Sequence, residues 1–144
     1  MAIIVTSSPS IDPTSAMFAP VIAGLIAGSS INVGAPCYIT SGSKVAMSTG
    51  SDAGVGDEFA RVAGFASRSA CPDEPVALYG PGVRFHYAAG TMTPGQPLYL
   101  EASASHGRLN SASNSMDPTG IAMAVSGFDI IVTRLITTAG SSGG

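Results

Sequence analysis

The segment Gly95-Gln96-Pro97-Leu98-Tyr99-Leu100 decides the fold class, because an earlier segment, Gly34-Ala35-Pro36-Cys37-Tyr38-Ile39, has the same pattern. In this pattern glycine permits a tight turn, and proline stiffens the entry to a strand while removing one main-chain donor. Tyrosine packs its ring and keeps its hydroxyl near solvent. We therefore expect two strands, marked by a fold motif that consists of Gly34, Pro36, Tyr38, Gly95, Pro97 and Tyr99.

The segments that follow the two copies occur in a similar order. Lys44-Val45, Gly64-Phe65-Ala66 and Val76-Ala77-Leu78 follow the first copy, and Arg108-Leu109, Gly120-Ile121-Ala122 and Ile130-Ile131-Val132 follow the second. This order predicts a duplicated β-domain over residues 21–138, with repeat halves at about 27–79 and 89–135. Chance similarity in a chain rich in glycine, alanine and serine is the alternative.

Glycine and proline interrupt the chain so often that a long helix has almost nowhere to form. The 18 glycines and 10 prolines leave Phe128 to Ala139 as the longest stretch without either, and its β-branched residues favour a strand. Further segments with strand character are Ile3 to Thr6, Val21 to Ala27, Cys37 to Thr40, Val76 to Tyr79, Val83 to Tyr87 and Leu98 to Glu101. The expected fold class is all-β, a compact β-sandwich or small β-barrel with little helix. The best helix candidate, Asp57 to Ala63, is a turn or two at most.

The two ends of the chain differ in composition from the middle. Residues 1–20 contain Pro9, Pro13 and Pro20 with several serines, which predicts an extended N-terminal arm. Residues 139–144 contain only alanine, glycine and serine, which predicts a tail.

The charge content restricts the kinds of partner. Charged residues make up 10% of the chain, against about a quarter in typical soluble domains, so we expect neighbouring subunits to cover much of the surface. The six basic residues are scattered and the net charge is −3, which argues against binding to nucleic acid or to an anionic membrane. The apolar stretch Ala16 to Gly28 is too short to cross a bilayer and contains Pro20 and Gly24.

No pattern of catalytic residues is recognisable. His86 and His106 are the only imidazoles, and neither has the sequence context of a known nucleophile. A small β-barrel enzyme, the least favoured hypothesis, would need one of them beside a carboxylate in a single pocket. We therefore expect no catalytic residue and no enzyme.

Metal and cofactor binding are also not expected. Cys37 and Cys71 are separated from each other and from the histidines, and we expect both to be reduced thiols. The acidic segment with Asp52, Asp57 and Glu58 lacks the alternating order of a calcium loop. No phosphate-binding loop is present, so we expect no cofactor.

The motif, the polar turn after it, the Gly-apolar-Ala step and the closing apolar strand together resemble the head decoration, or cement, proteins of tailed bacteriophages. The resemblance is clearest from Gly90 to Leu135, and in the first half Cys37 stands where Leu98 does. The residues that carry it are Gly95, Pro97, Tyr99, Gly107, Gly120, Ile121, Ala122 and Val132. It implies a structural homotrimer on the outer capsid surface of a virion, where it binds the major capsid protein and stabilises the shell.

An arm that contacts the shell would enlarge the binding surface of such a protein. We expect the candidate capsid or subunit contacts to be Ile3, Ile4, Val5, Met17 and Phe18. The alternative function is a carbohydrate- or host-surface-binding module of a phage head fibre or tail. Exposed tyrosines around a shallow groove would favour that alternative, whereas the absence of tryptophan disfavours it.

Overall fold

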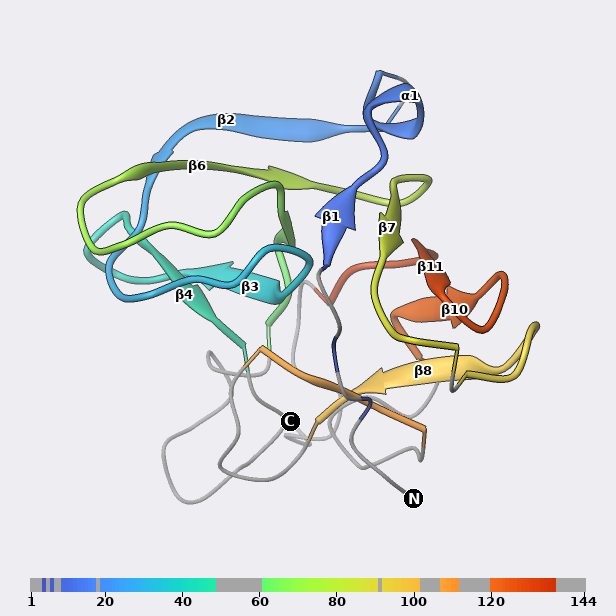
Figure 1. The fold of residues 1–144 in the computed structure, drawn as a ribbon. Coiled ribbons are helices and arrows are strands. Elements are labelled where there is room, and N and C mark those ends of the chain that lie inside the picture. The colour runs from blue at the N-terminus through green and yellow to red at the C-terminus, as the bar shows by residue number, and fades with distance from the viewer. Residues whose placement is uncertain are drawn as a thin grey trace.

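The protein is almost entirely β-structure, as the sequence predicts. The computed structural model describes residues 4, 6, 9–17, 19–48, 61–90, 92–101, 107–111 and 120–136. Within these ranges it contains eleven short strands and one helix of four residues, α1 (Pro13–Ala16). The strands form two antiparallel sheets that pack as a sandwich-like fold (Figure 1). The predicted all-β fold class is therefore confirmed.

The first sheet has five strands. They are β2 (Val21–Ile26), β3 (Pro36–Ile39), β4 (Val45–Met47), β5 (Gly64–Ala66) and β6 (Pro75–Tyr79). Their spatial order is β2-β6-β5-β3-β4, which places β2 and β4 at the two edges.

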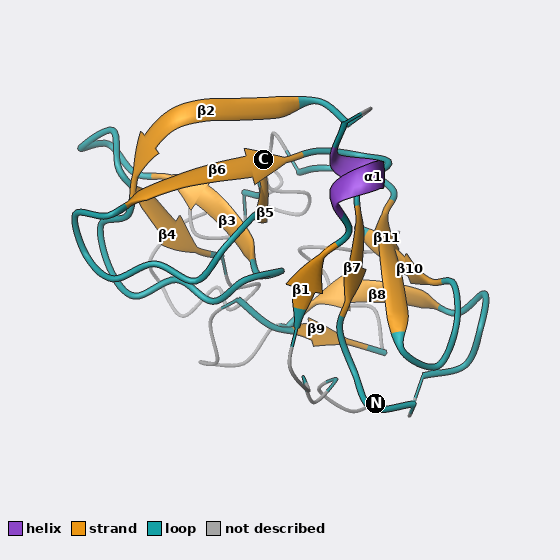
Figure 2. Ribbon diagram, turned by 45° about the horizontal axis from the view of Figure 1, so that its top comes forward, coloured by secondary structure: helices purple, strands orange, loops and turns teal. Residues whose placement is uncertain are grey.

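The second sheet has six strands, and Figure 2 shows both sheets from a second direction. The strands of the second sheet are β1 (Ser10–Ile11), β7 (Arg84–His86), β8 (Pro97–Leu100), β9 (Leu109–Asn110), β10 (Ala122–Ala124) and β11 (Asp129–Val132). Their order is β1-β7-β11-β10-β8-β9. Apart from the added β1, this is the order of the first sheet, with β7 in the place of β2 and β11 in the place of β6.

The glycines of the fold motif occupy matching positions in the two sheets. The Gly34 N–H donates to the Ala66 carbonyl at 2.8 Å, and the Gly95 N–H donates to the Ala124 carbonyl at 2.7 Å. Their φ angles are +78° and +87°, values that side chains rarely allow. The motif prolines then begin β3 and β8, so this local pattern places both strands correctly.

The predicted correspondence between Gly64-Phe65-Ala66 and Gly120-Ile121-Ala122 is wrong by two residues. Phe65 lies opposite Pro36, and Met123 lies opposite Pro97. The step centred on Phe65 therefore corresponds to the one centred on Met123, not on Ile121. The residues that lie opposite each other in the sheets define the true correspondence. A Gly-apolar-Ala step, by contrast, recurs easily by chance in a chain of this composition.

Two clusters of buried side chains form the core. The larger one joins the sheets, and in it Phe65 of the first sheet meets Phe85 of the second with ring centroids 6.2 Å apart. The smaller cluster belongs to the first sheet and consists mostly of small side chains: Ala27, Ile31, Ala35, Cys37, Val45, Ala66, Ala70, Val76 and Leu78. The second sheet therefore contributes more to the shared core than the first.

The predicted extended arm contains regular structure. Pro13 begins α1 because its fixed φ suits the first helical position, and the Asp12 side chain caps the helix by accepting from the Thr14 N–H at 3.2 Å. The prolines of this segment indicate an extended chain, but proline also occurs at the first position of helices, as Pro13 does here. The segment before α1 forms β1, which pairs with β7.

Two other predicted elements differ in extent. The last strand ends at Val132, and beyond it Ile136 forms only an isolated bridge with Val62. The helix candidate Asp57 to Ala63 lies mainly outside the described residues, and its described part contains that bridge and no helix. The predicted tail, residues 139–144, also lies outside the described residues.

Candidate docking surface

Strand β2 is an apolar edge of the first sheet. It is the outermost strand and pairs with β6 on one side (Figures 1 and 2). The residues Val21, Ile22 and Ile26 are 49%, 40% and 43% exposed, and Met17, just after α1, is 78% exposed. We call these four side chains, with the outer main-chain edge of β2, the β2 edge surface. Isolated exposed apolar side chains are ordinary, but several along one strand edge are typical of a contact site.

The β2 edge surface lies in an uncharged part of the chain. No charged residue occurs between Asp12 and Lys44. Proteins commonly protect a free strand edge with lysine or with inward-facing charge, and β2 has neither. The pairing with β6 is instead interrupted between Ile22 and Leu25, where Gly24 has φ +81°. The regular part of the edge before this interruption is Val21 to Ile22.

The corresponding edge of the second sheet is covered by the N-terminal segment. There the Asp12 N–H donates to the Arg84 carbonyl at 2.8 Å, and the Arg84 N–H donates to the Ser15 Oγ at 2.8 Å. Val21 holds the position of Arg84 in the register that the two sheets share. Within the described part of the chain, no group bonds the outward N–H or C=O of Val21. One edge thus carries an added strand, whereas no strand of the described residues covers its counterpart.

A shallow groove lies next to this edge. It has a volume of about 310 Å³, and its lining includes Ile11, Ala16 and Met17 from the N-terminal segment and Tyr79 from β6. Tyr79 is also the residue that lies opposite Val21 in the sheet. An added strand beside β2 would therefore have a nearby apolar groove for one of its side chains.

The five predicted contact residues have different positions. Met17 belongs to the β2 edge surface. Ile4 is buried in the larger core cluster, and its N–H donates to the Leu109 carbonyl at 2.8 Å, so it contacts its own chain. Ile3, Val5 and Phe18 lie outside the described residues.

Sequence reasoning missed Val21, Ile22 and Ile26 as candidate contacts. It assigned them to a strand, which is confirmed, but a strand assignment does not distinguish an edge from the middle of a sheet. The available signal was the uncharged run from residue 13 to residue 43, which includes all of β2.

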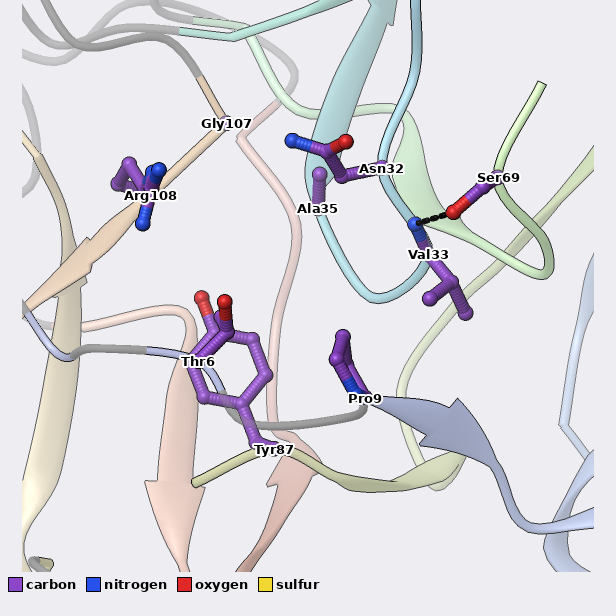
Figure 3. Close-up of a pocket in the computed structure, with 9 residues that line it drawn as sticks. All are labelled: Thr6, Pro9, Asn32, Val33, Ala35, Ser69, Tyr87, Gly107 and Arg108. Atoms are coloured by element: carbon purple, nitrogen blue, oxygen red, sulfur yellow. Dashed lines mark hydrogen bonds between the residues drawn. The ribbon is translucent and has the colours of Figure 1, made fainter. Parts of the chain in front are cut away.

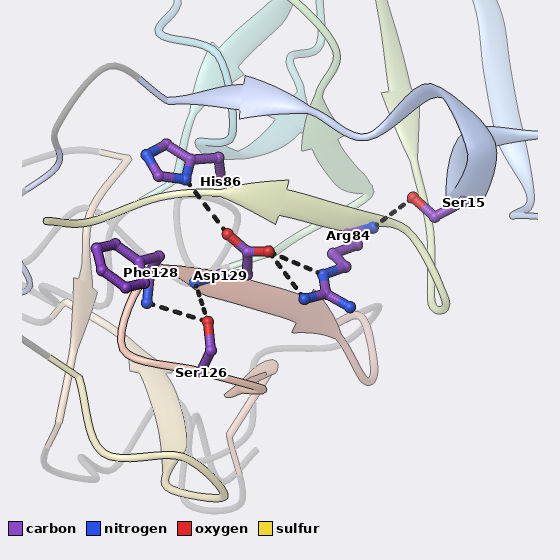
Figure 4. Close-up of polar contacts among 6 residues, drawn as sticks. All are labelled: Ser15, Arg84, His86, Ser126, Phe128 and Asp129. Carbon is purple, nitrogen blue, oxygen red and sulfur yellow. Dashed lines mark hydrogen bonds and ion pairs between the residues drawn. The ribbon is translucent and has the colours of Figure 1, made fainter. Parts of the chain in front are cut away.

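A polar cluster lies on strands β7 and β11 (Figure 4). The Arg84 Nε and Nη2 atoms lie 3.0 and 2.9 Å from Asp129 Oδ2, and His86 Nδ1 lies 3.3 Å from Asp129 Oδ1. The exposed ring of Phe128 stacks on His86 with ring centroids 6.3 Å apart. Because the Arg84 and Asp129 side chains are both partly exposed to solvent, their ion pair contributes at most about 1 kcal/mol to folding.

The polar cluster meets one condition of the enzyme hypothesis. His86 lies beside a carboxylate, and with Asp129 and Ser10 it lines a depression of about 440 Å³. Ser10 lies opposite His86 in the β1–β7 pair, yet among the described residues no hydrogen bond joins their side chains. Nucleophilic catalysis requires the base within hydrogen-bond reach of the nucleophile. The arrangement therefore offers an oriented histidine without an activated nucleophile, and His106 lies outside the described residues.

Both cysteines are free thiols, and their environments differ. Cys37 is buried, and desolvation raises the pKa of its thiol far above the ordinary value, whereas Cys71 is exposed. A thiol that resists ionisation is a poor nucleophile and metal ligand. The described ranges contain no group of three His, Cys, Asp or Glu side chains placed to hold a metal ion. The acidic segment with Asp52, Asp57 and Glu58 lies outside these ranges.

No protein-family model matches the chain, and no curated protein matches it. In the described part of the chain, no helix is long and apolar enough to cross a membrane.

Proposed function

We propose that this chain is a capsid decoration protein, which binds the outer surface of an icosahedral viral shell and stabilises contacts between copies of the major capsid protein. The observation that carries the proposal is the β2 edge surface, an apolar and uncharged strand edge whose counterpart in the other sheet is covered. The low charge of the whole chain and the resemblance of its second half to phage cement proteins support it.

The partner segment that fits this surface is an extended, uncharged stretch of the major capsid protein. It would pair antiparallel with β2, as β1 pairs antiparallel with β7. In such strand addition the main-chain hydrogen bonds supply affinity, and pockets for side chains supply specificity. The groove beside Met17 and Tyr79 would accept one apolar side chain of the added strand.

A homotrimer fits the small size of this surface. The regular edge before Gly24 offers only a few main-chain bonds, so a single contact would be weak. Three linked copies would bind three shell segments at once, and multivalency of this kind raises affinity by about 10²–10⁴. Weak individual contacts are thereby compatible with stable decoration of the shell.

A main-chain substitution tests the proposal. Val21→Pro removes the outward N–H of β2, while the pairing with β6 uses the neighbouring residues, as with the Gly80 N–H that donates to the Pro20 carbonyl at 2.8 Å. Val21→Ala is the matched control, because it shortens the side chain and keeps the N–H. Undecorated capsids would be mixed with each protein, and bound protein and the temperature of capsid disruption would be measured.

We expect the wild type and Val21→Ala to bind and to raise the disruption temperature, and Val21→Pro to bind at least about tenfold more weakly. Thermal unfolding of each free variant establishes that the fold is intact. Normal binding by a folded Val21→Pro variant would rule out strand addition at β2. Failure of the wild type to bind any capsid, with unchanged capsid stability, would rule out the decoration function itself.

The second candidate function is a carbohydrate- or host-surface-binding module. The observation that favours it is the exposed Phe128 ring beside the polar groups of Arg84, His86 and Asp129, because sugars pack on aromatic rings and hydrogen-bond to charged side chains. The tyrosines do not add to it, since two are buried and two are half-buried. A glycan array separates the two functions, because Phe128→Ala would abolish glycan binding and leave capsid binding unchanged.

A further inference from the structure

A cavity separates the loops of the first sheet from the second sheet (Figure 3). Its volume is about 350 Å³, within the range of about 300–1,000 Å³ that is typical of small-molecule sites. Asn32 and Ser69, from loops of the first sheet, are exposed at its rim, and Tyr87, which follows β7, is buried at its base. Arg108, just before β9, contributes a positive charge to the lining.

The Tyr87 hydroxyl is a buried polar group without a hydrogen-bond partner. The residue is 1% exposed, and its ring extends from the chain into the cavity (Figure 3). Arg108 acts on the hydroxyl through its charge, and the main chain of Leu109 lies close to it as a weak hydrogen-bonding group, but neither meets hydrogen-bond geometry with the hydroxyl. An unsatisfied buried hydroxyl costs about 1–3 kcal/mol, so its retention in a pocket points to a ligand that accepts its hydrogen.

The Arg108 side chain has no ion pair or hydrogen bond within the described part of the chain. Its cross-strand neighbour is Glu101, whose N–H donates to the Arg108 carbonyl at 3.0 Å. Among the described residues no ion pair joins the Glu101 carboxylate to Arg108, and this carboxylate accepts from the Asn110 side-chain amide at 2.6 Å. The guanidinium is therefore available to an acceptor that is not part of the described chain.

The remaining polar groups of the lining also supply donors. The Ser69 Oγ accepts from the Val33 N–H at 3.2 Å, which leaves the Ser69 hydroxyl hydrogen free to donate, and the Asn32 amide has two N–H donors. No carboxylate is among the described residues that line the cavity. A lining that has several donors, a single positive charge and no carboxylate is complementary to an oxyanion.

We propose that this cavity binds a small molecule that carries a carboxylate or phosphate group. Arg108 would hold the anion through its planar guanidinium, and the Tyr87 hydroxyl would donate to the anion or to an oxygen next to it. Asn32 and Ser69 would donate to the more exposed part of the ligand. This binding is independent of the β2 edge surface and would stabilise the fold, because the ligand contacts both halves only in the folded state.

The test is a titration of the intact chain with inorganic phosphate, glucuronate and glucose, followed through the main-chain amide NMR signals of Gly107, Arg108 and Ser69. Phosphate and glucuronate represent the two kinds of anion, and glucose is the neutral control. We expect saturable shifts with at least one anion and none with glucose. Binding of phosphate alone or of glucuronate alone supports the site and identifies its anion.

Two pairs of variants assign the binding groups. Arg108→Gln should weaken anion binding at least about tenfold, whereas Arg84→Gln, which removes a guanidinium of the polar cluster outside the cavity lining, should not change it. Tyr87→Phe should also weaken binding while leaving the unliganded protein as stable as the wild type or more stable, and Tyr99→Phe is its control. The absence of saturable shifts with both anions would overturn the proposal. So would equal shifts with glucose, or undiminished binding by Arg108→Gln.

Discussion

The two sheets share one strand order but differ at corresponding positions. Phe85 on β7 is completely buried, whereas Ile22 holds the same position on β2 and is 40% exposed. Leu100 on β8 and Ile39 on β3 show the same contrast, completely buried against 40% exposed. In addition, β1 covers β7, whereas no described strand covers the outer edge of β2. The same strand arrangement therefore forms buried core in the second sheet and exposed surface in the first.

The largest expected effect distinguishes the two corresponding strands, β7 and β2. Phe85→Ala should lower the free energy of unfolding by about 3–5 kcal/mol, because it opens a cavity where the two sheets meet. Ile22→Ala should cost about 1 kcal/mol or less, since much of its side chain is already in water. Chemical denaturation measures both. Equal costs would show that the two positions contribute alike and would remove the contrast between the sheets.

A smaller effect is expected where the sheets differ by one methyl group. Gly64 on β5 corresponds to Ala122 on β10, but a Cβ at Gly64 would lie 2.8 Å from the Leu78 Cβ and 3.1 Å from the Tyr79 carbonyl oxygen. Gly64→Ala should therefore destabilise the protein by about 1–3 kcal/mol through overpacking. Chemical denaturation is again the measurement, and a neutral or stabilising result would contradict the close packing of β5 on β6.

The next effect concerns the covered edge. Ser15→Ala removes the hydroxyl that accepts from the Arg84 N–H and should cost about 0.5–1.5 kcal/mol. Hydrogen exchange at the Arg84 amide should become faster in the same variant. The neighbouring Thr14→Ala is the control, and an effect as large in Thr14→Ala would mean that α1 as a whole, not the Ser15 hydroxyl, protects the edge.

Ionisation of Cys37 has the smallest expected effect on the free energy of unfolding at neutral pH. Cys37 lies at the position of β3 that corresponds to Leu98 of β8. Because burial raises the folded-state pKa of this thiol above its ordinary value of 9.0, its contribution to stability is complete below about pH 9 and is lost as the pH rises further. The loss approaches about 1.4 kcal/mol per pH unit.

Denaturation at a series of pH values from 8 to 10 would measure this loss. Cys37→Ala should flatten the decline, and Cys71→Ser, at the exposed thiol, should not. The Tyr87 hydroxyl is also buried with a raised pKa, so it contributes to the same decline in stability. Denaturation of Tyr87→Phe at the same pH values measures how much of the decline comes from Tyr87. A decline in Cys37→Ala as steep as in the wild type would contradict the prediction.

Local constraints explain what the sequence predicts well. The motif glycines require positive φ and the prolines stiffen strand entries, so β3 and β8 begin where the pattern places them. The alternation of apolar and polar side chains from Val83 to Tyr87 predicts the burial of Phe85, which is confirmed. The exposure of Ile22 was not predictable, because its strand is apolar on both faces and only tertiary packing decides which side chains are buried. The same limit applies to β1 and α1, whose positions depend on contacts with β7. Of the β2 edge surface, the sequence indicated Met17 alone.

Hydrogen exchange at the Val21 amide tests the central claim most directly. The proposal predicts fast exchange in the free protein, because this N–H points away from β6, and strong protection when the protein is bound to capsids. The Arg84 amide, at the same position of the covered edge, is the internal reference and should be protected in both states. Fast exchange at Val21 on fully decorated capsids would contradict strand addition at β2.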